Sequence, residues 1–204
     1  MSYVENTEYA ARNLIKLVSH EEIELAKLKQ ELTEEEAKFR VNRWDFETSD
    51  LNEDFSDAYV QAAFFRMAGA HQESERLKAR AAELQASIGT HQLSVQAMSG
   101  ALLQIAKQGI SVVHQSLAQA PDGRHLSGIP LKQIIWQGRN QALHYEEGQF
   151  NPAVTQLFNN LEAAFGSAFS LTLHPNQSRA TQVVRLLEWN TYENFSSDLR
   201  MLGL

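Results

Sequence analysis

One short string in this sequence carries side chains that could act on a phosphate group: Arg139, Asn140 and His144 in the run Arg-Asn-Gln-Ala-Leu-His. Histidine can give or take a proton near neutral pH. Arginine can hold a phosphate with two parallel hydrogen bonds and stabilise negative charge that develops on it. Asn140 and His144 are one helical turn apart, so the amide could orient the imidazole or bind phosphate itself.

The string lies within a segment that predicts one helix over residues 131–147. Pro130 stands at its start, because a proline at the first helical position loses no hydrogen bond. Gly148 stands at its end, because glycine accepts the left-handed conformation of a helix C-cap. Residues at helical spacing between them predict one stripe that faces a core: Leu131, Ile134, Ile135, Gly138, Ala142 and Tyr145.

The other side of this helix is apolar as well. Trp136 and Leu143 fall between Arg139 and His144 when the segment is wound as a helix. A helix that already buries one stripe in its own core does not need a second apolar patch. We therefore expect one face to pack the domain and the second to pack another subunit.

The run Arg139-Asn140-Gln141-Ala142-Leu143-His144 resembles the Arg-x(4–6)-His motif of HEPN domains, in its Arg-Asn-x-x-x-His form. These are small all-α domains, and many are metal-independent ribonucleases of toxin–antitoxin, phage-defence and RNA-processing systems. The resemblance covers about residues 90–168. It implies a homodimer in which the motif arginine and histidine of two protomers meet in one cleft, with RNA as substrate and no cofactor or metal.

Cleavage of RNA needs a base for the 2′-hydroxyl, an acid for the leaving oxygen and positive charge on the phosphorane. One histidine and one arginine are too few for these roles, whereas two of each in a symmetric dimer are enough. The resemblance also implies an alternative, an inactive HEPN-like module that binds a second copy or a partner such as an antitoxin or a nucleotidyltransferase. The plainest reading is an ordinary surface helix with an exposed Arg139 and His144. A looser match, Arg66 to His71, lacks the asparagine and contains Gly69.

The whole chain is rich in helix-forming residues and contains four prolines. It predicts an all-α, up-and-down helical bundle, HEPN-like, with an N-terminal helical extension. We expect a single all-helical domain over 1–204: an acidic helical extension over 1–50, a bundle core over 57–168 and a C-terminal helix over 178–202.

The N-terminal third predicts a helix, or two in sequence, over 4–40. Leucines recur along it at spacings that favour packing in an antiparallel hairpin or on the bundle over a free coiled coil. Residues 41–55 are interpreted as a connection that the aromatic rings of Trp44, Phe46 and Phe55 pin to the body of the protein.

Beyond this connection the pattern predicts separate helices over 57–87 and 90–118, with Gly100 and Gly109 as points of close packing. Residues 121–128 are rich in turn-forming types and predict a loop. Asn151 and Pro152 predict the start of the helix that follows the motif, by cap and first-position proline. The alternating stretch 169–174 is interpreted as a linker, because no second strand is available to pair with it.

Composition narrows the possible classes further. The net charge is −7, and residues 1–60 carry 15 acidic and 7 basic side chains, which argues against a protein that coats nucleic acid through a basic surface. The absence of cysteine excludes disulfides and thiol catalysis. No apolar run approaches membrane-spanning length, and the first residues lack the pattern of a secretion signal. We expect a cytoplasmic protein.

Overall fold

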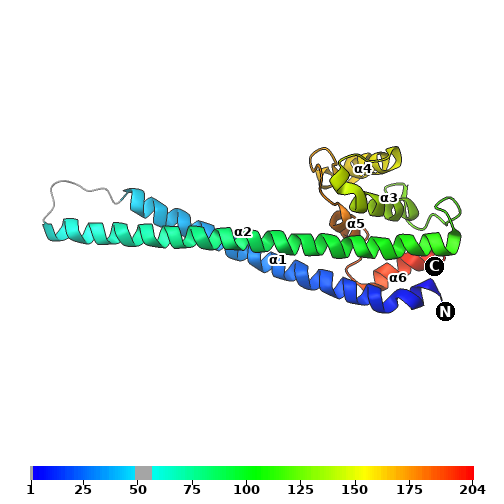
Figure 1. The fold of residues 1–204 in the computed structure, drawn as a ribbon, viewed down its shortest axis with the longest axis horizontal. Coiled ribbons are helices and arrows are strands. Elements are labelled where there is room, and N and C mark those ends of the chain that lie inside the picture. Colours follow the sequence, from blue (N-terminus) through cyan, green and yellow to red (C-terminus); the bar gives the residue numbers. More distant parts are fainter. Residues whose placement is uncertain (1, 49–56) are drawn as a thin grey trace. The chain divides into compact units, whose positions relative to one another are not determined.

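The computed structural model describes residues 2–48 and 57–204 and is mostly helical, as the sequence predicts (Figure 1). Its internal contacts divide the chain into two compact units, unit 1 comprising Met1–Glu21 and Leu93–Leu204, and unit 2 comprising Glu22–Gln92. Residues 57–92, which we assigned to the bundle core, are thus grouped with part of the N-terminal extension. No helix of the described ranges is apolar enough over a sufficient length to cross a membrane.

The first two helices are longer than predicted. Helix α1 runs without a break over Tyr3–Thr48, so the part of the expected connection before residue 49 is helical. Trp44 lies on this helix and is exposed, while Phe55 and the side chain of Phe46 lie outside the described residues. Helix α2 runs over Asp57–His114, and the predicted break near residue 88 is absent. Helix α2 continues through Gly89 because packing of its buried face outweighs the weak helix propensity of an isolated glycine.

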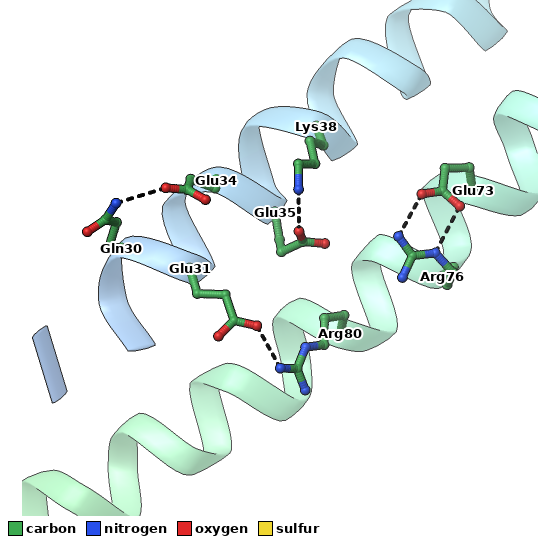
Figure 2. Close-up of polar contacts among 8 residues, drawn as sticks. All are labelled: Gln30, Glu31, Glu34, Glu35, Lys38, Glu73, Arg76 and Arg80. Carbon is green, nitrogen blue, oxygen red and sulfur yellow. Dashed lines mark hydrogen bonds and ion pairs between the residues drawn. The ribbon is translucent and has the colours of Figure 1, made fainter. Parts of the chain in front are cut away.

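In unit 2, α1 and α2 form an antiparallel pair held in register by charge (Figure 2). Facing residues of opposite sign follow one another along the pair: Glu31 with Arg80, Glu35 with Arg76, and Lys38 with Glu73. Residue numbers increase along α1 while those of the facing residues on α2 decrease. The two helices are therefore antiparallel, which confirms the predicted hairpin packing. Beneath this charged face Leu25 and Leu84 are buried.

In unit 1, the start of α1 and the end of α2 pack with all the later elements around one apolar core. The hydroxyl of Tyr3 on α1 donates to the carbonyl of Ile105 on α2 at 2.8 Å. Gly109 admits this contact, because a Cβ there would lie 2.6 Å from the Tyr3 ring. Large side chains without exposed surface fill the centre: Leu102, Leu103, Ile110, Leu131, Ile134, Ile135, Phe158, Leu161, Trp189 and Phe195.

A short β-hairpin, with two residues in each strand, precedes the motif helix where the sequence predicts only a loop. Strands β1 (His125–Leu126) and β2 (Ile129–Pro130) pair antiparallel, with Leu126 opposite Ile129. The two residues between them, Ser127 and Gly128, both have positive φ, at 48° and 82°. This backbone matches the tight turns that suit the twist of paired strands. The hairpin delivers the chain directly into α3.

The motif helix, α3, spans Leu131–His144 and continues as a 3-10 turn, η1, over Tyr145–Glu147. Gly148 ends this segment in the left-handed conformation with φ 67°, as predicted. Helix α4 (Pro152–Phe165) follows and packs on α3. Asn151 caps it by accepting a hydrogen bond from the backbone N–H of Val154 at 3.0 Å, which confirms the predicted start.

The end of the chain corrects the prediction of one C-terminal helix over 178–202. After a 3-10 turn η2 (Ser167–Phe169) and a linker without strand, two helices form: α5 (Ala180–Leu186) and α6 (Tyr192–Met201). Glu188 between them takes a left-handed conformation with φ 57°. The break lets the indole of Trp189 turn inward and donate to the buried Asp198 carboxylate at 2.8 Å. A buried aromatic with a satisfied N–H outweighs the local cost of a non-glycine residue at positive φ.

Candidate functional site

Helix α3 is fixed in unit 1 by both apolar and polar contacts on its inner face. The predicted stripe is buried at Leu131, Ile134, Ile135 and Gly138, and partly buried at Ala142 and Tyr145. Gly138 permits close approach of α5, because a Cβ there would lie 3.2 Å from Val183 Cγ1. Gln141 has no exposed surface; it donates to the carbonyl of Gln177 and accepts from the backbone N–H of Arg179. These contacts set the rotation of the helix and therefore the direction of its motif side chains.

Arg139 is half-buried and lies against α2. Its Nε donates to Gln104 Oε1 at 2.5 Å, and its Nη1 donates to Asn140 Oδ1 at 3.4 Å. Its Nη2 has no hydrogen bond to any residue that the structure describes. The bond to Gln104 orients the guanidinium, and Nη2 remains available to donate to an anion.

His144 is the last residue of α3, and its side chain is 48% exposed. The imidazole Nδ1 lies 2.7 Å from Oε1 of Glu147, which is 64% exposed and stands in η1. An ionised carboxylate only accepts hydrogen bonds, so Nδ1 must carry the proton. Nε2 has no partner among the described residues. In the neutral form of the ring Nε2 would therefore be the nitrogen that can accept a proton.

Asn140 does not take the place beside the imidazole that its spacing suggests. Its Oδ1 accepts from Arg139, and its Nδ2 donates to Gln137 at 3.1 Å. Asn140 therefore supports Arg139, whereas Glu147 holds His144. His144 follows Arg139 by five positions on one helix, which turns their side chains about 140° apart around the axis. The two motif groups of one protomer consequently face different directions.

Of the two residues predicted to form a second apolar patch on α3, only Leu143 is exposed. Leu143 is 58% exposed, as expected of a side chain that awaits a partner. Trp136 instead packs on the edge of the core, with the ammonium of Lys107 lying 4.3 Å from the centre of its ring. This position satisfies the indole face within the chain through a cation–π contact.

A pocket of about 620 Å³ opens between α2 and α3 in unit 1. Arg139 and Leu143 lie on one side of it, and Tyr145 lines it beside them. Its wall is formed largely by small and apolar residues of α2, with Gln96, Gln104 and Ser178 adding polar groups: Leu93, Gln96, Ala97, Gly100, Ala101, Gln104, Arg139, Ala142, Leu143, Tyr145 and Ser178. The hydrogen bond that the Tyr145 hydroxyl donates to Glu146 raises the pKa of the phenol, so this ring stays neutral. The pocket is of the size and composition of small-ligand sites.

Two charged residues, Arg124 and His125, lie near the start of α3, and the structure gives Arg124 a structural role. Arg124 forms a two-pronged ion pair with the buried Asp198, with bonds of 2.7 and 2.9 Å, and also donates to the carbonyl of Leu187. The pairing raises the pKa of Arg124. His125 is exposed on the hairpin, away from the motif. Within the described ranges no group of three or more His, Asp or Glu side chains gathers as metal ligands would.

Sequence reasoning missed two residues of the site. Glu147 follows His144 by three positions, a spacing at which helical side chains meet, so this contact could have been found. Gln104 lies 35 residues before Arg139, and no sequence pattern joins the two. No known protein family, curated protein or solved structure matches this chain.

Proposed function

We propose that this protein is a HEPN-like, metal-independent endoribonuclease whose active site forms between two copies of the chain. One observation carries the proposal: His144, whose Nδ1 lies 2.7 Å from Glu147 Oε1, is 48% exposed at the end of the helix from which Arg139 lines the pocket. A solvent-facing imidazole and a guanidinium with a nitrogen free to bind phosphate are groups that acid–base cleavage of RNA can use.

The divergence of the two side chains supports a shared site. Because Arg139 and His144 leave α3 in different directions, one protomer cannot surround a phosphate with both groups. A symmetric dimer brings two copies of each together, since the same patch meets itself across a two-fold axis. The exposed Leu143 lies between the two motif side chains and supplies an apolar contact at the centre of such an interface.

The chemistry then follows from the roles of these groups. His144 Nε2 takes the proton of the RNA 2′-hydroxyl, whose oxygen attacks the adjacent phosphorus. The partner's His144, in its protonated form, gives a proton to the departing 5′-oxygen, and the products are a 2′,3′-cyclic phosphate and a free 5′-hydroxyl. Arg139 stabilises the charge that develops on the phosphorane. A nuclease of this kind belongs to a toxin–antitoxin, phage-defence or RNA-processing system, and an antitoxin is the partner we would expect.

A second candidate is a non-catalytic HEPN-like module that binds another copy of itself or a partner such as a nucleotidyltransferase. Leu93 and Leu143 favour it, because both are more than half exposed at the edge of a mainly apolar pocket. In this case the motif polar groups specify an interface and perform no chemistry.

The two candidates are separated by cleavage of single-stranded RNA in EDTA, with oligomeric state measured by sedimentation. We expect wild type to produce cyclic-phosphate ends, and His144→Ala and Arg139→Ala to lose about 100-fold or more of the rate. His125→Ala is the matched control, because its side chain is also 48% exposed in unit 1 but lies outside the motif. If wild type and His144→Ala are equally inert while both remain dimers, the module replaces the nuclease.

A further inference from the structure

The pocket between α2 and α3 has a wall on α2 with open space above Gly100 among the described residues. Glycine weakens a helix relative to alanine, so a glycine inside α2 calls for a physical reason. At Gly109 and Gly138 the reason is packing, since a Cβ would press on Tyr3 or Val183. At Gly100, which lines the pocket, a Cβ would meet no atom within 4 Å. The missing side chain at Gly100 leaves open space in the pocket and serves no contact within unit 1.

Polar groups converge on the same space. Arg139 lines the pocket with an Nη2 that has no partner among the described residues, while its Nε is bonded to Gln104. The amide nitrogens of Gln96 and Gln104 have no bond to a described residue, and side-chain amides of this kind pair with the edges of nucleobases. The neutral phenol of Tyr145 stands near them. One cation with amide groups beside an apolar wall suits a ligand with one phosphate and one flat, polar-edged ring.

We propose that this pocket binds one nucleotide of the RNA strand, with the base against Ala97, Gly100 and Ala101 and the phosphate on Arg139. The inference rests on the proposed nuclease function and adds to it the subsite that selects the nucleotide at the cut. It also agrees with the net charge of −7: a single-nucleotide pocket with one arginine needs no basic track along the surface.

The test uses the intact protein and adenosine, guanosine, cytidine and uridine 5′-monophosphates as probes in titration calorimetry. We expect at least one of them to bind, and Gly100→Leu, which fills the pocket, to weaken this binding at least tenfold. Gly89→Leu is the matched control, because Gly89 also lies inside α2 with no atom within 4 Å of a Cβ but is part of unit 2. If circular dichroism shows that Gly100→Leu is unfolded, Ala97→Leu, at an exposed position of the same wall, takes its place.

Inorganic phosphate is the second arm of the titration. Binding of phosphate as tight as that of the nucleotides would show an anion site without a base pocket and would overturn the proposal. Equal affinity of Gly100→Leu and wild type for the nucleotides would overturn it as well. Loss of the dimer in Gly100→Leu, with no nucleotide bound by wild type, would show that a second copy of the chain fills the pocket.

The outcomes also separate this inference from the function on which it rests. If wild type cuts RNA, His144→Ala does not, and Gly100→Leu cuts with unchanged KM, the nuclease stands and the nucleotide pocket fails. If nucleotides bind in the pocket but no RNA is cut, the pocket stands and the nuclease fails. A rise in KM of at least tenfold for Gly100→Leu, with kcat retained, supports both.

Discussion

Replacing Glu147 by glutamine tests whether the carboxylate holds the imidazole in its working tautomer. The Oε1–Nδ1 distance is 2.7 Å, but the carboxylate is 64% and the imidazole 48% exposed. In a buried catalytic triad, loss of such a carboxylate costs about 10⁴ in rate. Here water competes for both groups, so the contribution lies between that of an exposed ion pair, about 0.2–1 kcal/mol, and that of a charged hydrogen bond, about 1.5–3 kcal/mol.

We therefore expect Glu147→Gln to lower kcat by about tenfold, equivalent to about 1.4 kcal/mol, with little change in KM. Glu146→Gln is the control, because the neighbouring carboxylate accepts from the Tyr145 hydroxyl and has no bond to the imidazole. Steady-state cleavage of one defined RNA oligonucleotide measures both variants. Equal rates for the two glutamine variants would refute the role assigned to Glu147, and a loss of three orders of magnitude would refute the argument from exposure.

Three further predictions concern stability and are checked by urea unfolding. Asp198→Asn leaves the Arg124 guanidinium without its buried counter-charge, and we expect a loss of about 3 kcal/mol, the lower end of the range because Arg124 is one-third exposed; a loss below 1 kcal/mol would contradict this. Gly138→Ala should lose about 1 kcal/mol, because crowding of Val183 at 3.2 Å exceeds the gain in helix propensity; a stabilised variant, or fully additive losses with Val183→Ala, would count against it. Arg179→Met should lower the free energy of unfolding by less than about 1 kcal/mol, or raise it. The residue is only 3% exposed, burial lowers the pKa of its guanidinium, and its side-chain hydrogen bonds reach only carbonyl and amide oxygens. A loss of several kcal/mol would show that the buried charge is compensated.

The sequence predicted those features of unit 1 that follow from local rules. Pro130, Gly148 and Asn151 mark helix boundaries through backbone conformation and capping, which depend on near neighbours alone. The buried stripe of α3 follows from helical periodicity for the same reason. The lengths of α1 and α2 were harder to predict, because they depend on contacts between the two helices. Such contacts, for example that of Glu31 with Arg80, form only in the folded protein.

Features that depend on distant contacts escaped prediction. The break between α5 and α6 contains no glycine or proline and arises because Trp189 turns inward to reach Asp198. Gln104 became part of the site through tertiary packing alone. From its spacing Asn140 could orient the imidazole or bind phosphate, and in the structure its side chain bonds those of Arg139 and Gln137. Helical spacing shows which side chains can meet, and competition among the available partners decides which of them do.

The central claim is that His144 works only when a second copy of the chain supplies its counterpart. Specific activity in EDTA, measured across a dilution series that passes through the dimer dissociation constant, tests this claim most directly. We predict that activity per chain falls in step with the fraction of dimer determined by sedimentation. Constant activity per chain in samples that contain only monomer would contradict the shared site.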